Sequence, residues 1–432
     1  VQENYAAFFL LFAVWSFGCN VFLAPPKGIE AEGFLEVDCS FFYTDIPMDT
    51  ILDDLPEAKE WGQWLGFYSS GTTGNQKKFV YSVQTLLALL ENVETKIRES
   101  EVLTLLEKNS AFDGRKILSM LPVYHILGFL TPMALIAFAC EPIYCDCIGI
   151  SHIVQVVREE KAIAMIGVPV LWELLYNVAK RKCANAEHPI QSILGRQLQI
   201  ILSGGSKTSA VLRKAYLNDG IHFLVGYGMT ELGFLTLSSS KEKDILSEGT
   251  VYSMYDYKIQ TETGEWLDEG EGELFVDTSG LCSARFENGE IQKINLVDGR
   301  YFPTGDIFLL KERQLYFRGR KKNVIVCENG ENIFAEEIEE QLSSLKALKI
   351  PYCVGEYKGM PVLYLHTFGN KVTEATIKHV ITVIKMVNKT LYVSSKIKKI
   401  VCIEEALEQN AKGRLLIYKL KENSALRVVD IL

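Results

Sequence analysis

The chain has 432 residues, of which 48% are hydrophobic and 23% are charged, a composition typical of a folded protein with a large core and room for two or three domains. Its net charge of −9 and its lack of a long basic run argue against nucleic-acid binding. Ten cysteines are scattered without a Cys-x-x-Cys pair, which argues against a zinc finger and indicates reduced thiols in a cytoplasmic protein.

The first apolar segment, at residues 6–23, has about the length of a membrane span but not its composition. It has no basic flank of the kind found in signal peptides, and it contains Gly18 and Asn20. We therefore expect a buried helix that ends near Gly18, then a buried strand at residues 21–24, and no stable membrane insertion. A membrane-anchored protein is the weakest alternative.

A hydroxyl- and glycine-rich loop follows at residues 68–78 (YSSGTTGNQKK). Its glycines can adopt positive φ and let backbone N–H groups approach an anion, while its hydroxyls and lysine add donors and charge. The spacing is not that of a Walker A loop, which requires glycine where Gln76 stands. The pattern predicts a phosphate-binding loop, with a flexible solvated turn as the alternative. Its candidate ligands are Ser69, Ser70, Gly71, Thr72, Thr73, Gly74 and Lys77.

Helical-period segments alternate with short apolar runs in the next part of the chain, which predicts an α/β fold with parallel strands. The expected helices include residues 82–106 and 171–180. The expected strands are residues 116–121, 162–167, 199–202 and 222–225. Glycine-rich motifs directly follow the last two strands, where parallel sheets bind their ligands.

After Val251 the pattern changes to short strands punctuated by glycines, which predicts antiparallel β structure. A second change near Gly319 introduces a region with a net charge of about +5, against about −14 for the rest of the chain. Its pattern predicts an α+β unit of about 110 residues. The expected elements are strands at 323–327, 352–354 and 362–367 and helices at 335–345 and 373–391.

Several further motifs follow the loop in a fixed order. They are LPVYHILG at 121–128, SGGS at 203–206, GYGMTE at 226–231, TGD at 304–306, GRKK at 319–322 and NAKGR at 410–414. The ordered set resembles the adenylate-forming superfamily of acyl-CoA synthetases, luciferases and adenylation domains of peptide synthetases. The resemblance extends over nearly the whole chain.

This resemblance implies a large AMP-binding domain at residues 1–319, built of stacked βα sheets plus a small β-barrel-like region at about 250–318. A small mobile α+β domain at 320–432 is expected to follow a hinge at Lys322. Members of the family have a further N-terminal region before an apolar helix and strand like those at 6–24, so we expect an N-terminally truncated chain.

The resemblance also implies an ATP site, because adenylation must hold a triphosphate, Mg²⁺, a ribose and a carboxylate in line. The loop is expected to bind the β- and γ-phosphates, Thr230 to donate to phosphate, and Glu231 to ligate Mg²⁺. Asp306 is expected to bind the ribose hydroxyls, and Arg320 to complete the clamp. Adenine is expected to stack against Gly204, Gly205, Ser206, Gly226 and Tyr227.

Each motif also has a structural interpretation. GYGMTE is typical of a turn followed by a helix cap, paired glycines are typical of close packing, and an Asp–Arg pair is typical of a surface ion pair. His125 matches the residue that gates the carboxylate pocket in the family, although a packed core histidine is the alternative.

The last motif departs from the family, which ends in Thr-Gly-Lys with a lysine that contacts the α-phosphate and the attacking carboxylate. This chain has Lys412, Gly413 and Arg414. Arginine presents a planar fork rather than a compact charge. Three outcomes stay open: Arg414 acts at a reduced rate, Lys412 replaces the lysine, or adenylation is crippled.

The whole pattern favours an ATP- and magnesium-dependent ligase that forms an acyl-adenylate, releases pyrophosphate and passes the acyl group to CoA. A fatty acid is the favoured substrate, because residues 328–339 (ENGENIFAEEIE) resemble the pattern of long-chain acyl-CoA synthetases. Residues 121–128 contain no acidic side chain to hold the amine of an amino acid. The alternatives are a ligase that loads a carrier protein and a degenerate relative that binds nucleotide or acyl chain without turnover.

Overall fold

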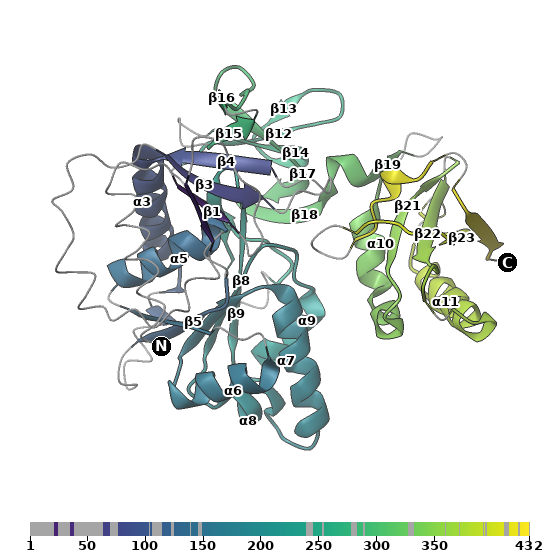
Figure 1. Ribbon diagram of the computed structural model, residues 1–432, viewed down its shortest axis with the longest axis horizontal. Helices are drawn as coiled ribbons and strands as arrows, with labels where there is room; N and C mark the ends of the chain where they lie inside the picture. The colour runs from purple at the N-terminus through teal and green to yellow at the C-terminus, as the bar shows by residue number, and fades with distance from the viewer. Residues whose placement is uncertain are drawn as a thin grey trace.

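The described part of the chain folds into two large sheets, a two-stranded hairpin and a four-stranded sheet, with helices packed on them (Figure 1). The computed structural model describes residues 21–24, 35–38, 64–69, 77–102, 104–105, 115–121, 125–138, 140–145, 149–238, 245–252, 255–277, 283–287, 290–326, 332–358, 360–370, 372–391, 393, 395–409, 414–421 and 424–431. Among the described helices, none is long and apolar enough to cross a membrane.

Five parallel strands form one end of a 12-stranded sheet, in the order β6-β5-β7-β8-β9. They are β5 (Lys116–Ser119), β6 (Glu141–Tyr144), β7 (Ala164–Gly167), β8 (Ile200–Ser203) and β9 (His222–Met229). The structure confirms the four predicted strands, with ends shifted by a few residues. Sequence analysis missed β6, an edge strand whose first residues, Glu141 and Pro142, disfavour a strand.

Helices cover both faces of these parallel strands (Figure 1). They are α3 (Val83–Glu99), α5 (Ile126–Ala137), α6 (Ile150–Glu159), α7 (Pro169–Lys182), α8 (Pro189–Leu194) and α9 (Ala210–Asn218). The two predicted helices are confirmed as α3 and α7. The first is shorter than predicted and begins after Ser82, whose hydroxyl accepts a hydrogen bond from the N–H of Thr85.

Alternate residues of each strand belong to different cores, as the period of a strand requires. Leu118, Met165 and Ile201 pack in the core that includes residues of α6 to α9. Each of these residues is preceded in sequence by one that faces the other side of the sheet. These preceding residues, Ile117, Ala164 and Ile200, pack in a core that includes residues of α3 and α5. The sheet is therefore buried on both faces, which explains why its strands are almost wholly apolar.

Beyond β9 the same sheet continues with antiparallel strands, in the order β9-β10-β11-β18-β17-β14-β12-β13. These strands are β10 (Gly233–Leu237), β11 (Thr250–Val251), β12 (Tyr257–Gln260), β13 (Trp266–Leu267), β14 (Gly270–Asp277), β17 (Tyr301–Lys311) and β18 (Gln314–Arg320). The antiparallel region predicted after Val251 is confirmed. These strands are continuous with the parallel strands, because β18 pairs with β11 and β11 with β10. The barrel-like character expected at about 250–318 stays a prediction.

A second, six-stranded sheet has the order β16-β15-β4-β3-β1-β2. Its strands are β1 (Val21–Ala24), β2 (Leu35–Asp38), β3 (Trp64–Ser69), β4 (Lys77–Ser82), β15 (Ala284–Glu287) and β16 (Glu290–Lys293). The strand predicted at residues 21–24 is confirmed as β1. The helix predicted before it lies outside the described residues.

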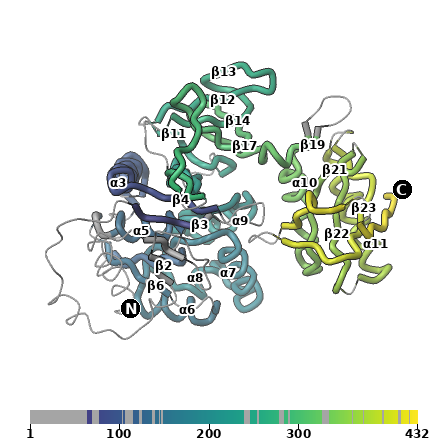
Figure 2. Tube along the Cα trace, turned by 45° about the horizontal axis from the view of Figure 1, so that its top comes forward, coloured from purple at the N-terminus to yellow at the C-terminus, as the bar shows by residue number. Residues whose placement is uncertain are grey.

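The last part of the chain forms a four-stranded sheet with helices packed against it. Its elements are β19 (Val324–Val326), β20 (Asn332–Phe334), α10 (Ala335–Gln341), β21 (Tyr352–Tyr357), β22 (Met360–His366), α11 (Glu374–Val387), β23 (Lys399–Ile403) and β24 (Leu426–Asp430). The strands and helices predicted here are confirmed in type and order, but both helices end earlier than predicted, and a 3₁₀ helix at Ser343–Leu348 follows α10. Figure 2 shows from a second direction that α10, α11 and their strands lie beside the larger part. The division at residues 319 and 320 stays a prediction.

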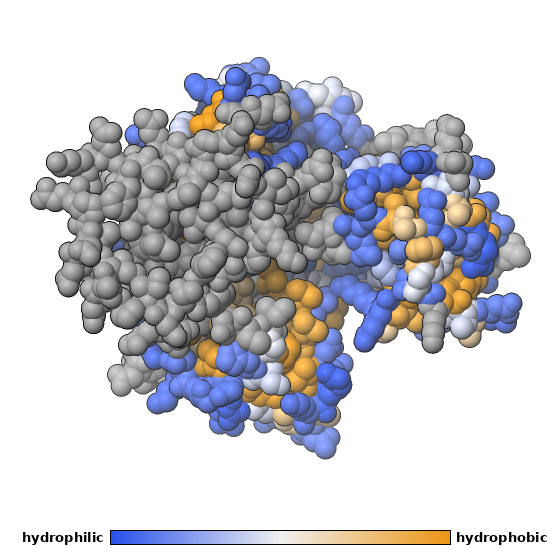
Figure 3. Space-filling view, viewed as in Figure 1, coloured by the Kyte–Doolittle hydropathy of each residue, from blue (hydrophilic) through white to orange (hydrophobic). Residues whose placement is uncertain are grey.

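Salt bridges between side chains join the two parts. Lys207 lies 2.8 Å from Glu340, and Glu173 lies 2.9 Å from Lys346. On the face shown in Figure 3, apolar side chains reach the surface over α7 and α9, where Val170 and Val211 are more than half exposed. Salt bridges therefore link the C-terminal part to the larger part, close to the apolar surface of α7 and α9.

Candidate active site

Two glycine motifs meet at the carboxyl ends of neighbouring parallel strands. Ser203, the last residue of β8, pairs with Val225 of β9, so Gly204 follows the end of β8 while Gly226 comes next on β9. A Cβ added to Gly204 would lie 3.7 Å from the carbonyl oxygen of Gly226, and Gly205 has φ of +80°. Gly204, Gly205, Ser206 and Gly226 are therefore brought together, as the proposed adenine wall requires. Their contact with adenine stays a prediction.

Glycine is required at two positions of β9 because other groups approach closely. A Cβ on Gly226 would clash with the ring of Phe234, and one on Gly228 would clash with the carbonyl of Gly233. The packing interpretation of these glycines therefore has physical support. It does not oppose ligand binding, because the same missing side chain leaves a flat backbone surface.

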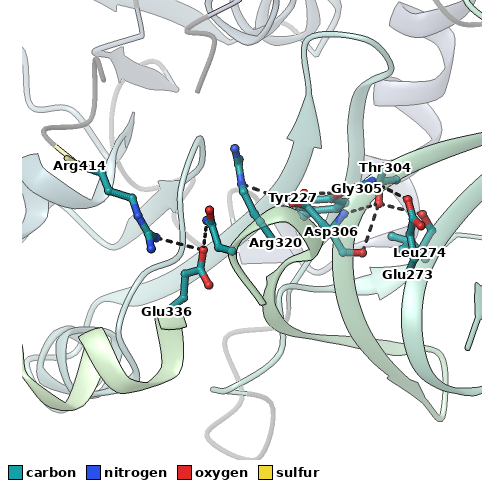
Figure 4. A network of polar contacts seen from close by, with 10 residues as sticks. Tyr227, Glu273, Leu274, Thr304, Gly305, Asp306, Arg320, Glu336 and Arg414 are labelled. Atoms are coloured by element: carbon teal, nitrogen blue, oxygen red, sulfur yellow. Dashed lines mark hydrogen bonds and ion pairs between the residues drawn. The ribbon is translucent and has the colours of Figure 1, made fainter. Parts of the chain in front are cut away.

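Tyr227, Asp306 and Arg320 form one polar cluster (Figure 4). The Tyr227 hydroxyl donates to Asp306 Oδ2 over 3.0 Å, and Arg320 Nε lies 3.4 Å from Asp306 Oδ1. Burial and the charge of Asp306 raise the pKa of Tyr227 well above its ordinary value, so the hydroxyl stays protonated. A carboxylate has about four lone-pair sites, so Asp306 can still accept bonds from a ligand.

The position of Asp306 is fixed by contacts of the two residues that precede it on β17. Thr304 Oγ1 donates to the carbonyl of Leu274 over 2.8 Å, and the Gly305 N–H donates to Glu273 Oε1 over 3.2 Å. The other oxygen of Glu273 lies 2.6 Å from Lys321 Nζ. Asp306 and Arg320 are also directly paired on the neighbouring strands β17 and β18. The strand pairing therefore holds the two side chains next to each other before any ligand binds.

Thr230 and Glu231 lie in the tight turn between β9 and β10, not at a helix cap. The helix-cap interpretation of GYGMTE was therefore wrong. The hydroxyl of Tyr81 donates to the carbonyl of Thr230, and the Ser283 N–H donates to the carbonyl of Glu231 over 3.0 Å. These contacts anchor the turn from the second sheet.

Glu231 is the candidate ligand of Mg²⁺. Burial raises the pKa of its carboxyl group, while the nearby cations Lys77 and Arg285 oppose that rise. A bound divalent cation would likewise stabilise the carboxylate, so the residue fits the ion chemically. Among the described residues, no group of three or more His, Cys, Asp or Glu side chains is placed to hold a metal ion.

The phosphate-loop candidates are described only at their ends. Ser69 ends β3 and pairs with Lys77, which begins β4, so the loop connects two adjacent antiparallel strands. Lys77 acts electrostatically on both Glu231 and Lys322. The candidates Ser70, Gly71, Thr72, Thr73 and Gly74 lie outside the described residues.

Arg414 lies between two carboxylates of α10. Its guanidinium is 3.1 Å from Glu336 Oε1 and 3.0 Å from Glu339 Oε1, and it donates to the Val354 carbonyl over 3.3 Å. Burial alone would lower the pKa of Arg414, but Glu339 and Glu336 raise it. The guanidinium of Arg414 thus binds carboxylates and a carbonyl of the C-terminal part, while Asp306 is paired with Arg320 (Figure 4).

Lys412, the candidate replacement for the family's lysine, lies outside the described residues. Lys322, the candidate hinge, lies in a short 3₁₀ helix after β18. Desolvation lowers the pKa of Lys322, and the cations Arg320, Lys77 and Arg414 lower it further. Cations from three parts of the sequence thus lie near one another. The predicted hinge at Lys322 and the predicted phosphate contacts of Lys77 and Arg320 stay predictions.

An apolar pocket extends along α5 from Gly204 and Gly226, which together we call the glycine wall. It holds about 940 Å³ of space not occupied by atoms, its open mouth included. Ser203, Gly204 and Gly226 form one end, and Leu127 of α5 lies near Gly204. His125 precedes α5, between the lining residues Leu121 and Leu127. Its position at this end agrees with the expected gate, which stays a prediction.

Sequence analysis missed several residues of this region. Glu336 and Glu339 were noted as part of a family pattern, but not as partners of Arg414. Lys96, which is fully buried beside the pocket, was also missed. Its signal was its position on the apolar stripe of α3, after Leu89 and Val93 at helical spacing.

The glycine motifs at one end of an α/β sheet, the cluster of Tyr227, Asp306 and Arg320, and an apolar pocket thus lie together, where α/β proteins commonly bind ligands. The family model "AMP-binding enzyme" matches residues 52–284. This chain belongs to that family.

Curated relatives support the same family. The YdaB protein of Bacillus subtilis, whose name describes an acyl–CoA ligase, is 25% identical over 296 residues, which cover 67% of this chain and 54% of that protein. A long-chain-fatty-acid–CoA ligase of Mycobacterium bovis is 25% identical over 333 residues, 67% of this chain and 52% of the relative. This chain thus spans about half the length of these relatives.

A solved structure shows the same fold. It is the o-succinylbenzoate CoA synthetase of Bacillus subtilis in complex with its acyl-adenylate intermediate, with a TM-score of 0.66 and 19% identity. The match covers 96% of this chain and 81% of that one.

Proposed function

We propose that this chain is an ATP-dependent carboxylic acid:CoA ligase, most suited to a fatty acid. The observation that carries the proposal is the apolar pocket that begins at the glycine wall. Such a pocket allows an acid to place its carboxylate beside the nucleotide while its chain lies between α5 and the sheet.

The first half-reaction would use the groups described above. An oxygen of the substrate carboxylate attacks the α-phosphorus of ATP, the bond from that phosphorus to the bridging oxygen breaks, and pyrophosphate leaves. Asp306 would hold the ribose, and Arg320, Lys77 and Lys322 would offset phosphate charge. Mg²⁺, held through Glu231, would supply further neutralisation when bound.

In the second half-reaction, the thiol sulfur of CoA attacks the acyl carbonyl carbon, the thiol proton passes to solvent, and AMP leaves with its phosphate oxygen. The chain of the acid would stay in the pocket throughout. A carrier protein would present the same thiol, so it stays an alternative acceptor.

The lining of the pocket supports a fatty acid. Its described residues are apolar except for Ser203 and Thr131, so nothing in the lining would pair with a second carboxylate or an amine. The pocket follows α5 from Leu127 to Phe138, a distance of about 16 Å along a helix. A straight acyl chain would lie along this apolar lining.

One observation favours a second candidate, a relative that binds nucleotide and acid but adenylates poorly. Arg414 stands near the family's catalytic lysine in sequence, yet Glu336 and Glu339 engage its guanidinium. An arginine held in this way cannot reach an α-phosphate unless these contacts break.

The experiment is a pocket-blocking substitution. Ala134 lines the pocket on α5, so Ala134→Trp fills the channel beyond its mouth. With a panel of straight-chain acids, ATP-dependent pyrophosphate release should shift from long to short acids by about tenfold or more. An unchanged chain-length preference would exclude this pocket as the acyl site. Undiminished activity with short acids is the internal control for folding.

A further inference from the structure

We propose that Lys96 is a positioning residue for the acyl pocket: its ammonium holds the backbone of Phe234, and thereby the ring that narrows the pocket beside Gly226. This inference rests on the proposed function, because it assigns a selectivity to the same pocket.

Lys96 is an anomaly in the core. It is fully buried, and it ends the buried stripe of α3 after Leu86, Leu89 and Val93. An ammonium in such a place is costly unless it makes strong contacts. A methionine or leucine there would continue the stripe at no such cost, so the lysine needs a specific explanation.

The contacts of Lys96 provide one. Its ammonium donates to the carbonyl of Phe234 and lies 5.4 Å from the ring centroid of Phe234. The rings of Tyr252 and Tyr255 lie 5.9 and 4.7 Å away, which gives further cation–π attraction. Asn92, one turn earlier on α3, donates to the Tyr255 hydroxyl over 3.0 Å and steadies this cage.

The carbonyl that Lys96 holds belongs to an interrupted strand. The pairing of β10 with β9 shifts register between Phe234 and Thr236, as at a β-bulge. Side chains bind both carbonyls there: Lys96 binds that of Phe234, and the Tyr257 hydroxyl donates to that of Leu235 over 3.0 Å. Two side-chain hydrogen bonds, from Lys96 and from Tyr257, therefore stabilise the bulge.

The bulge matters because it places a ring at the pocket. Phe234 lines the pocket, and its ring stands directly against Gly226 in the glycine wall. Val93 and Ile97, which flank Lys96 on α3, line the same pocket. The ring therefore stands where the carboxylate end of an acid must approach the nucleotide. A released ring would admit acids that are wider near the carboxylate.

The charge of Lys96 is adjustable. Burial lowers its pKa to about 7. The titratable groups that face it are Tyr252 and Tyr255, whose own pKa values burial raises, with Glu99 acting on Tyr252. The packed elements α5 and β10 carry no titratable side chain, and β4 carries Lys77, Lys78 and Tyr81. Loss of the proton would weaken the hold on Phe234 as pH rises through neutrality.

The test compares Lys96→Met with Lys180→Met, the same change at an exposed lysine that stacks on Tyr176. The readout is the ratio of dissociation constants for a straight-chain acid and its α-branched isomer, measured by direct binding without ATP. Lys96→Met should shift the ratio about tenfold towards the branched acid, the size of one charged hydrogen bond, whereas Lys180→Met should leave it unchanged.

Phe234→Leu should give the same shift, and adding Lys96→Met to it should add nothing, since both act through one ring. An unchanged ratio, or two shifts that add, would overturn the proposal. If Lys96→Met does not fold, the wild-type ratio decides: it should move in the same direction between pH 6 and pH 9, and a flat profile would refute the role. Because binding needs no turnover, failure of the ligase proposal leaves this result interpretable.

Discussion

Asp306 lies on β17 of the main sheet, and its carboxylate is the candidate acceptor for the ribose hydroxyls of a nucleotide. Tyr227 donates to one of its oxygens, and Arg320 lies beside the other. The Thr304 and Gly305 contacts fix the segment of β17 before it, so its carboxylate does not depend on a ligand for its position. A preorganised acceptor of this kind loses little entropy when ribose hydroxyls bind.

Replacement of this acceptor should weaken ATP binding. We expect Asp306→Asn to raise the dissociation constant for ATP about tenfold or more, because it removes a charged acceptor. Tyr227→Phe removes only one donor to Asp306 and should cost a few-fold. Isothermal titration with ATP measures both. Equal affinity for wild type and Asp306→Asn would contradict the assignment.

Arg414 should contribute to stability whatever its part in catalysis. Arg414→Met leaves Glu336 and Glu339 without their cation, so we expect a loss of about 2 to 4 kcal/mol in the free energy of unfolding. The control is Arg427→Met, since its pair with Glu404 is half exposed and worth under about 1 kcal/mol. Urea unfolding compares the two; equal losses would mean that the Arg414 contacts are not formed in solution.

Single residues also show what sequence can predict of a site. The glycines, Tyr227, Asp306 and Arg320 were assigned to one nucleotide, and the structure brings them together. The hydrogen bond from Tyr227 to Asp306 was not foreseen, because the two residues are 79 positions apart in sequence and lie on strands that do not pair with each other. The partners of Arg414 were missed for the same reason, since α10 lies far from Arg414 in sequence.

At the scale of elements, α3 combines helix packing with a buried charge. Between pH 7 and 10.5 the unfolded chain keeps the Lys96 proton and the folded chain has lost it, so folded stability rises with pH in this window. The penalty is complete below pH 7 and disappears above pH 10.5.

Lys96→Met removes this linkage. The difference in melting temperature between Lys96→Met and wild type should therefore change steadily from pH 7 to pH 10, in favour of wild type as pH rises. Differential scanning calorimetry in matched buffers measures it, and the exposed change Lys180→Met provides the baseline. A pH-independent difference would show that Lys96 keeps an ordinary pKa.

Elements were predicted better than their pairing. Periodicity and turn residues located β7, β8, β9 and α7 within a few residues, because these signals are local. The sequence did not predict that β15 pairs with β4 across about 200 residues, or that β11 joins β18. Such pairings are decided by packing between distant segments, which no local pattern contains.

At the scale of the whole molecule, two ion pairs link the C-terminal part to α7 and to the turn before α9. Charge reversal at Lys207→Glu should loosen this contact with Glu340 and raise the radius of gyration measured by small-angle X-ray scattering. The double variant with Glu340→Lys should restore the wild-type value. Because these side chains are partly exposed, high salt should reduce the difference. A radius unaffected by either change would show that the pairs do not hold the parts together.

The most direct test of the whole account is ATP-dependent pyrophosphate release by this chain with straight-chain fatty acids, aryl acids and dicarboxylates, each with and without CoA. We predict release with straight-chain acids that increases when CoA is added. Absence of release with every acid, from protein that still binds ATP, would contradict the ligase and favour the nucleotide- and acid-binding relative in which Arg414 stays paired with Glu336 and Glu339.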